Sequence, residues 1–232
     1  WVAGVMFGCA MGVKWNSVYV LAAFAVLSVL WDVGARRLAG ADFRSWMALL
    51  YDGLPAFVAL VLGAVATYVA TWTGWFATSG GWDRTWGTQH PDDPLVKAFG
   101  TDLASWLWYH KEIYDFHTGD FINKATHPYN ANPAGWLLML RPIGIDAING
   151  IKNGTEGCTV PSGDCRRVSS GLGTPLLWWF AAVALVVACV WWLAGRDWRF
   201  GVAVVGVAST WLPWVYQGVT TTRPLFFFYA II

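Results

Sequence analysis

The stretch Pro175–Ala194, PLLWWFAAVALVVACVWWLA, decides the fold class of this chain. It contains no charged residue, and it matches the roughly 20 residues that an α-helix needs to cross the hydrocarbon core of a bilayer. Tryptophans stand near both of its ends, as in the aromatic belts of membrane proteins. The stretch therefore predicts a membrane-spanning helix.

The composition extends this prediction to the whole chain. Its 232 residues are 56% hydrophobic and 12% charged, whereas a soluble domain has about 25% charged residues. The net charge of +1 gives no indication of a nucleic-acid partner. We expect an all-α integral membrane protein with several spans. Further apolar runs lie at Trp1–Val13, Ser17–Val33, Pro55–Trp72 and Phe200–Tyr216, and one more begins at Leu225.

A polar interruption separates the first two runs. Lys14-Trp15-Asn16 could lie inside one long helix or could form a turn between two short helices. We expect the turn, because a lysine in the middle of a bilayer is costly. Since the chain begins at Trp1 and ends within the apolar run FFFYAII, we also expect a fragment of a larger membrane protein.

The charges of the short connections predict the topology. Gly34–Asp52 carries three arginines and Gly195–Arg199 carries two, so both connections should face the cytoplasm. The Lys14 turn and the polar turn Gln217–Pro224, with Arg223, then lie outside. We expect three parts: membrane helices over 1–72, a large extracytoplasmic loop over 73–174, and C-terminal membrane helices over 175–232.

The loop contains an apolar stripe of helical period. Seven residues recur at a spacing of three or four between Leu103 and His117, which predicts an amphipathic surface helix near 101–118. Thr101 or Asp102 can cap its start, and Gly119 suits its end. Trp108, Glu112 and Asp115 fall on the opposite face. The stripe consists of Leu103, Trp106, Leu107, His110, Ile113, Tyr114 and His117.

Two histidines of this stripe are candidate substrate contacts. His110 and His117 are either packed, hydrogen-bonded side chains or contacts to a phosphate or sugar hydroxyl. Their spacing of seven residues corresponds to about 10 Å along a helix, which is too far for both to bind one zinc ion at about 2 Å. We therefore predict no metal site.

The segment that follows holds further polar candidates. His127-Pro-Tyr129 and Asn130–Pro133 form a rigid turn segment, because proline fixes the backbone and asparagine bonds its own chain. This segment is either a plain structured loop or part of a binding site. Arg141 beside Pro142 is either an anchor at the membrane boundary or a bidentate partner for a phosphate.

Two of the four cysteines stand in a polar loop. Cys158 and Cys165 flank TVPSGD, and we expect a disulfide between them if the loop faces an oxidising compartment. A metal pair is less favoured, because no histidine is near them in sequence. The sequence contains no Walker loop, dinucleotide-binding glycine motif, HExxH or GxSxG.

Six segments together resemble the protein O-mannosyltransferases, in their bacterial branch. The two most specific are YHKEIYDFHTG at Tyr109–Gly119 and HPYNANPAGWLLMLRPI at His127–Ile143. The segments occur in family order over nearly the whole chain. The other four are VKWNSVYVLAAF at Val13–Phe24, TWTGWF at Thr71–Phe76, LGTPLLWW at Leu172–Trp179 and FFFYA at Phe226–Ala230.

The resemblance implies a GT-C transferase in the bacterial plasma membrane. Such an enzyme moves mannose from a polyprenyl phosphate to Ser or Thr of exported proteins, which it can receive from the secretion translocon. The reaction inverts the sugar and takes place on the extracytoplasmic side. Its donor is a lipid-linked sugar, and no cofactor is predicted; the resemblance leaves any requirement for a metal open.

The resemblance also assigns expected roles. The family's Asp-Glu pair, which supplies the general base, belongs to an earlier loop than these segments, so we expect this chain to be inactive alone. Glu112 and Asp115 are weaker candidates for the base. Arg223 matches the family incompletely, because QGVTTTRP replaces an aromatic-flanked arginine. The expected substrate-binding residues are Lys14, His110, His117, His127, Tyr129, Arg141 and Arg223.

Three other functions remain possible from the sequence. The first is a related GT-C transferase with a lipid or glycan acceptor, and the second is a non-catalytic membrane scaffold. The third, a transporter or channel, is disfavoured because charges are sparse within the spans and there is no pair of interrupted helices.

Overall fold

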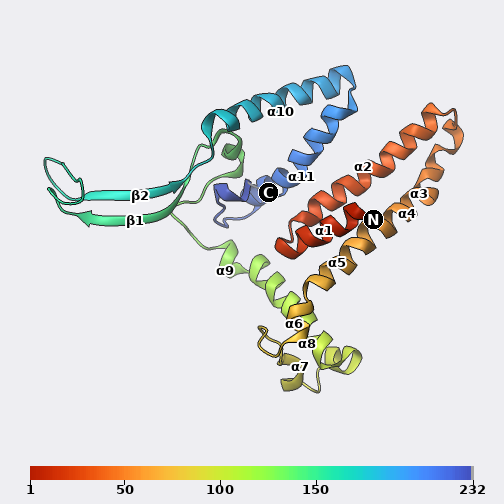
Figure 1. The fold of residues 1–232 in the computed structure, drawn as a ribbon, viewed down its shortest axis with the longest axis horizontal. Helices are drawn as coiled ribbons and strands as arrows, with labels where there is room; N and C mark the ends of the chain where they lie inside the picture. The colour runs from red at the N-terminus through yellow and green to blue at the C-terminus, as the bar shows by residue number, and fades with distance from the viewer. Residues whose placement is uncertain (231–232) are drawn as a thin grey trace. The chain divides into compact units, whose positions relative to one another are not determined.

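A computed structural model describes residues 1–230, without the side chains of residues 42 and 43 (Figure 1). The chain forms two compact units, Trp1–Gly119 and Asp120–Ile232. Four helical segments of the described chain are long and apolar enough to cross a membrane. The predicted helical membrane class is therefore confirmed. These segments are Ser17–Leu38, Arg44–Thr71, Pro175–Gly195 and Trp198–Thr220.

The first unit begins with two helices joined by the predicted turn. Helix α1 covers Val2–Val13 and helix α2 covers Ser17–Leu38. Residues 14–16 lie outside both helices, so the prediction of a turn at Lys14 is confirmed. Helix α2 extends beyond the predicted Val33, and its last turn carries Arg36 and Arg37. The guanidinium of Arg36 donates to both carboxylate oxygens of Asp52, at 2.6 and 3.0 Å.

The next span is helical but not uniform. It consists of a 3₁₀ segment η1 (Asp42–Met47), α3 (Ala48–Tyr51), α4 (Gly53–Phe57), a π-helical turn η2 (Val58–Leu62) and α5 (Gly63–Thr71). Pro55 has no N–H to donate within a helix. The π-helical turn begins three residues after it.

Glycines of α1 allow its backbone to pack closely on this span. A Cβ atom at Gly4 would lie 2.1 Å from the carbonyl oxygen of Ala59, and one at Gly8 would lie 2.5 Å from that of Ala64. Figure 1 shows α1 beside α5. Such contacts between small residues are typical of helix packing in membranes, where close backbone approach replaces the hydrophobic effect.

A small helical region completes the first unit. It contains α6 (Thr73–Ala77), α7 (Trp86–Gln89) and α8 (Pro94–Thr118). Gly100, with φ of 76°, kinks α8 just before the predicted start at Thr101. The predicted cap is wrong, because Asp93 caps α8 by accepting from the N–H of Leu95, and Asp102 binds Arg84 instead. The helix ends before Gly119, as its sequence indicated.

The second unit contains an unpredicted β-hairpin. Strands β1 (Ile143–Ile151) and β2 (Cys165–Gly171) pair antiparallel, from Ile143 opposite Gly171 to Ile151 opposite Cys165. Figure 1 shows the hairpin extending from the helices α10 and α11. The disulfide between Cys158 and Cys165 closes its tip, so this prediction is confirmed.

Two spans form the rest of the second unit with three short helices. Helix α10 covers Pro175–Gly195 and α11 covers Trp198–Thr220, joined at Arg196 and Asp197. The polar turn was predicted to begin at Gln217, but α11 continues to Thr220, so the turn begins after that residue. The span predicted to start at Leu225 stays a prediction; Leu225 itself is buried and lies outside any helix. The short helices are α9 (Asp120–Asn123), η3 (Pro133–Leu138) and η4 (Phe227–Ala230).

Candidate functional site

The predicted site residues divide between the two units. Lys14, His110, Glu112, Asp115 and His117 belong to Trp1–Gly119. The remaining candidates, His127, Tyr129, Arg141 and Arg223, belong to the second unit. The two motif blocks that carry the family resemblance thus form two separate constellations.

His110 is the centre of an aromatic hydrogen-bonded cluster. The Tyr68 hydroxyl lies 2.6 Å from Nε2 of His110, and Nε1 of Trp15 donates to the same hydroxyl at 2.9 Å. Nδ1 of His110 lies 2.8 Å from the carbonyl oxygen of Trp106. The rings of Trp72 and Trp106 pack against the imidazole, with centroids at 4.9 and 4.1 Å. The cluster joins α5 and α8 to the Lys14 turn.

These contacts determine the tautomer of His110. A carbonyl oxygen only accepts, so Nδ1 must carry the hydrogen and Nε2 accepts from the Tyr68 hydroxyl. Burial lowers the pKa of His110 from its usual 6.5, and the hydrogen bond to the Trp106 carbonyl opposes this shift. The imidazole is therefore a packed, neutral and fully hydrogen-bonded group. Sequence reasoning missed its partners Trp15, Tyr68 and Trp72, because they lie far from His110 in the sequence, outside α8.

The other candidates of the first unit lie outside this cluster. His117 and Glu112 are exposed, and Asp115 pairs with Lys111 one turn earlier on α8. The expected helix faces are partly wrong, since Trp108, placed on the polar face, stacks on Trp86 at 4.5 Å. Lys14 is half-buried in the turn beside Trp15.

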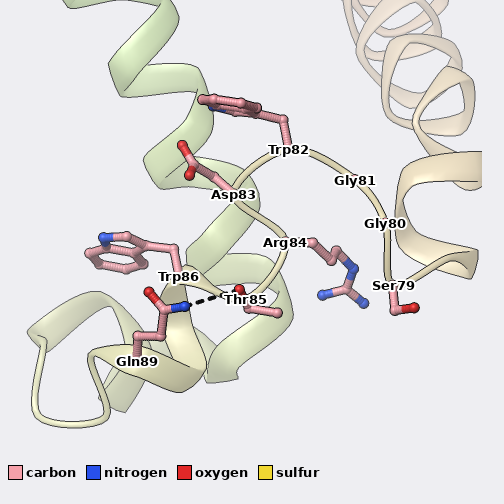
Figure 2. A pocket seen from close by; sticks show the side chains of 9 residues that line it. All are labelled: Ser79, Gly80, Gly81, Trp82, Asp83, Arg84, Thr85, Trp86 and Gln89. Atoms are coloured by element: carbon pink, nitrogen blue, oxygen red, sulfur yellow. Dashed lines mark hydrogen bonds between the residues drawn. The ribbon is translucent and has the colours of Figure 1, made fainter.

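The loop between α6 and α7 surrounds a surface hollow of about 480 Å³, formed by residues 79–86 and Gln89 (Figure 2). Arg84 turns toward Ser79 there, away from Trp86 and Gln89. Its guanidinium donates to both carboxylate oxygens of Asp102 at 2.7 and 2.9 Å, which lowers the pKa of that carboxyl. Because the charge of Arg84 is neutralised within the chain, we do not assign a substrate to this hollow.

The second unit arranges its candidates around one β-turn, His127–Asn130. The N–H of Asn130 donates to the carbonyl oxygen of His127 at 3.0 Å, which closes the turn. The N–H of Tyr129 donates to Nδ1 of His127 at 3.2 Å. Arg141 donates from one terminal nitrogen to the carbonyl oxygen of Pro128 at 2.6 Å. Tyr129 packs on Gly144, where a Cβ would lie 2.4 Å from its ring. His127, Tyr129 and Arg141 therefore lie together.

Tryptophan side chains hold the backbone after this turn. Nε1 of Trp136 donates to the carbonyl of Ala131 at 3.0 Å, and Nε1 of Trp211 donates to that of Pro133 at 2.8 Å. Nε1 of Trp178 donates to the carbonyl of Trp136 at 2.8 Å. Trp136 is almost fully buried. The loop is thus fixed to α10 and α11 by donors on large apolar rings.

The chain after α11 runs along the same turn. The N–H of Leu225 donates to Oδ1 of Asn130 at 2.8 Å, and the carbonyl of Leu225 accepts from the N–H of Ala131 at 2.7 Å. The ring of Phe226 contacts His127 edge-on at 4.9 Å. This pairing holds the segment that carries Arg223 against the turn. No local pattern in the sequence indicates this pairing, because the partners are 95 residues apart.

No group of three or more potential metal-ligating His, Cys, Asp or Glu side chains occurs among the described residues. The cysteines of the hairpin tip are joined to each other, so the metal pair that the sequence left open is not formed there.

Comparison with known proteins gives relatives along almost the whole chain. A polyprenol-phosphate-mannose–protein mannosyltransferase of Mycobacterium tuberculosis is 34% identical over 231 residues, covering 98% of this chain and 42% of the relative. Proteins of the same name from Corynebacterium glutamicum and Mycolicibacterium smegmatis are 31% and 30% identical, covering 42% and 43% of their lengths. No protein-family model and no solved structure matches the chain.

The match covers both motif blocks and both compact units. The chain spans about two fifths of the length of these relatives, in their C-terminal region. The resemblance drawn from the sequence motifs is thereby confirmed: this chain is homologous to the C-terminal region of the polyprenol-phosphate-mannose–protein mannosyltransferases.

Proposed function

We propose that this chain takes part in the transfer of mannose from a polyprenyl phosphate to Ser or Thr side chains of exported proteins. The observation that carries the proposal is the similarity over 98% of the chain to enzymes of that name. The ordered turn with His127, Tyr129 and Arg141 supports it, because this turn is built from the most specific motif block.

The proposed reaction takes place on the extracytoplasmic side, within a GT-C fold. Two features support this side. Arg36 and Arg37 end α2, and Arg196 joins α10 to α11, so basic residues gather at one end of each pair of spans. The hydrogen bond from Trp15 to Tyr68 places the Lys14 turn at the opposite end of the first pair. Acceptor proteins would meet the enzyme there as they leave the secretion translocon.

The leaving phosphate requires fixed positive charge and hydrogen-bond donors. Negative charge grows on its oxygens as the glycosidic bond breaks, and preorganised donors stabilise it best. We assign this role to Arg141, supported by Arg223 of the same unit. His127 and Tyr129 position the donor, while His110 holds the aromatic cluster and His117 lies at the end of α8. Inversion requires a base on the face opposite the leaving group.

The carboxylates of the candidate regions are poorly suited to be that base. Asp115 pairs with Lys111, Asp102 pairs with Arg84, and Glu112 is exposed on α8. We propose that the base comes from a part of the relatives' length that this chain does not match, and that the chain alone is inactive.

A chimera tests the function directly. This chain replaces the matching region of the Corynebacterium glutamicum relative, and membranes are assayed with polyprenyl-phosphate mannose and a Ser/Thr-rich peptide. We expect mannosylated peptide from the chimera and a loss of at least about tenfold with Arg141→Ala, since charge-assisted hydrogen bonds are the strong ones.

The controls separate the alternatives. Arg166→Ala, on the exposed strand β2, should leave transfer unchanged. A folded chimera that mannosylates a lipid or glycan but no peptide would point to the related transferase, and a folded chimera without any transfer would favour a scaffold.

A further inference from the structure

The side chains of His127 and Asn130 present hydrogen-bond donors outward, because their acceptor atoms are used within the chain. Nδ1 of His127 accepts from the N–H of Tyr129, so in the neutral ring the hydrogen lies on Nε2. The amide oxygen of Asn130 accepts from the N–H of Leu225. This bond settles which end of the amide is oxygen, and it leaves the NH₂ group as the outward atom.

The remaining donors of these side chains are accessible. His127, Asn130 and Arg141 are all exposed. Among residues 1–230, no acceptor is bonded to Nδ2 of Asn130 or to Nε2 of His127. Arg141 uses one nitrogen on the Pro128 carbonyl and keeps its other N–H groups for a ligand.

The three residues that carry these donors are linked through one turn. His127 and Asn130 are the first and last residues of a β-turn, whose Cα atoms are within about 7 Å of each other. Arg141 is bonded to Pro128, the second residue of the same turn. All three donors therefore belong to one turn or to the side chain bonded to it.

Carboxylates do not compete for this position. Asp120, Glu156, Asp164 and Asp197 of the second unit each pair with a lysine or arginine close to them. Asp146, on strand β1, forms an ion pair neither with Arg141 nor with another described cation. In the described part of the chain, no carboxylate lies within ion-pair distance of Arg141. A donor-only set around an arginine is suited to a phosphate rather than to a metal ion or a neutral sugar.

We propose that Asn130 is a further substrate-contacting residue, whose NH₂ group, beside His127 and Arg141, donates to the phosphate of the lipid-linked sugar. This inference rests on the proposed function, and it identifies Nδ2 of Asn130 as an atom that donates to the phosphate. The hydrogen bond from the N–H of Leu225 orients the Asn130 amide, because it prevents the amide from presenting its oxygen to the anion.

The substitution Asn130→Asp tests the proposal while keeping the hydrogen bond from Leu225. A carboxylate oxygen still accepts from the N–H of Leu225, but the outward group changes from a donor to a negatively charged acceptor. Asn132→Asp is the matched control. Its side chain accepts from the N–H of Ala134 and caps η3, a role that aspartate fills equally well. It adds the same charge two residues away.

Binding is measured on the purified chain in lipid nanodiscs by calorimetric titration with farnesyl phosphate, and separately with inorganic phosphate. We expect Asn130→Asp to weaken binding of farnesyl phosphate by at least about tenfold, the loss of one charge-assisted hydrogen bond, and Asn132→Asp by less than about threefold. Weaker binding of inorganic phosphate in the same rank order would support recognition of the phosphate itself, whether on a lipid or free.

Three results would overturn the proposal. They are binding by Asn130→Asp that equals wild type, equal losses in both variants, and no binding of farnesyl phosphate by the wild-type chain. Since the assay measures binding without transfer, a chimera that fails to move mannose while the chain binds farnesyl phosphate would overturn the proposed function alone.

Discussion

Replacing Tyr68 with phenylalanine removes the hydroxyl that joins Trp15 to His110. Phenylalanine fills the same space apart from one oxygen atom, so the change deletes two hydrogen bonds and little packing. Each bond contributes about 1 kcal/mol net, and a buried group left without a partner costs about 1–3 kcal/mol. Because Tyr68 and His110 are only half-buried, water can partly replace the lost partner.

We therefore expect Tyr68→Phe to lower the free energy of unfolding by about 2 kcal/mol. For a chain of this size, that change corresponds to a fall in Tm of about 4–8 °C. The assay is thermal unfolding in detergent, followed by tryptophan fluorescence. Tyr19→Phe is the matched control, because Tyr19 lies on the exposed surface of α2 and should cost less than about 0.5 kcal/mol.

A double-mutant cycle makes this reasoning refutable. Trp15→Phe and Tyr68→Phe share one hydrogen bond, so their effects should be less than additive by about 1 kcal/mol. Full additivity, or a loss for Tyr68→Phe no larger than that of the Tyr19 control, would show that the cluster does not stabilise the first unit.

Three further predictions concern other parts of the chain. Burial lowers the pKa of His110 below 6.5, so the unfolded chain binds a proton before the folded chain as pH falls. The free energy of unfolding should therefore be highest above pH 6.5 and should decline below it. The variant His110→Asn should lose this pH dependence. Gly8→Ala should destabilise the chain by about 2–3 kcal/mol, since its Cβ would lie 2.5 Å from the Ala64 carbonyl oxygen. The control Gly34→Ala places its Cβ where nothing lies within 4 Å, so it should show no loss of stability in the same unfolding assay. Replacing Cys158 and Cys165 with serine should open the hairpin tip to trypsin near Arg166 while α10 and α11 stay intact on a gel; equal protection with and without the disulfide would contradict this.

The membrane spans were predictable because the bilayer imposes both their length and their composition. The boundaries of α1 and α10 agree with the apolar runs to within a residue or two. The turn at Lys14 was predictable for the same reason, since a charge rarely lies at mid-bilayer. The disulfide followed from the spacing of two cysteines in one polar loop.

The polar constellations were predicted as residues but not as geometry. The helical stripe correctly included Trp106 and His110, but it placed Trp108 on the solvent face, where the α7 residue Trp86 covers it. A periodic pattern does not indicate which neighbouring helix packs on which side. The hairpin was missed because it depends on the pairing of β1 with β2 across a long loop. The largely polar sequence of β2 does not by itself indicate a partner strand.

Asn130 was named only as part of a rigid segment. Its orientation depends on Leu225, which the sequence placed at the start of a span rather than in extended chain. Buried contacts across so many residues leave no local signal. A charged residue such as Arg141 can be proposed from the sequence alone, whereas the orientation of Asn130 depends on a bond to a distant backbone group.

The tryptophans that hold the loop after the turn have a genetic consequence. Trp136, Trp178 and Trp211 each offer a large apolar ring and one N–H aimed at a carbonyl oxygen. Tryptophan has a single codon, and one nucleotide change converts it to arginine, glycine, serine, leucine, cysteine or a stop, none of them aromatic. At these three positions every single-base mutation therefore removes both the ring and the donor that hold the loop.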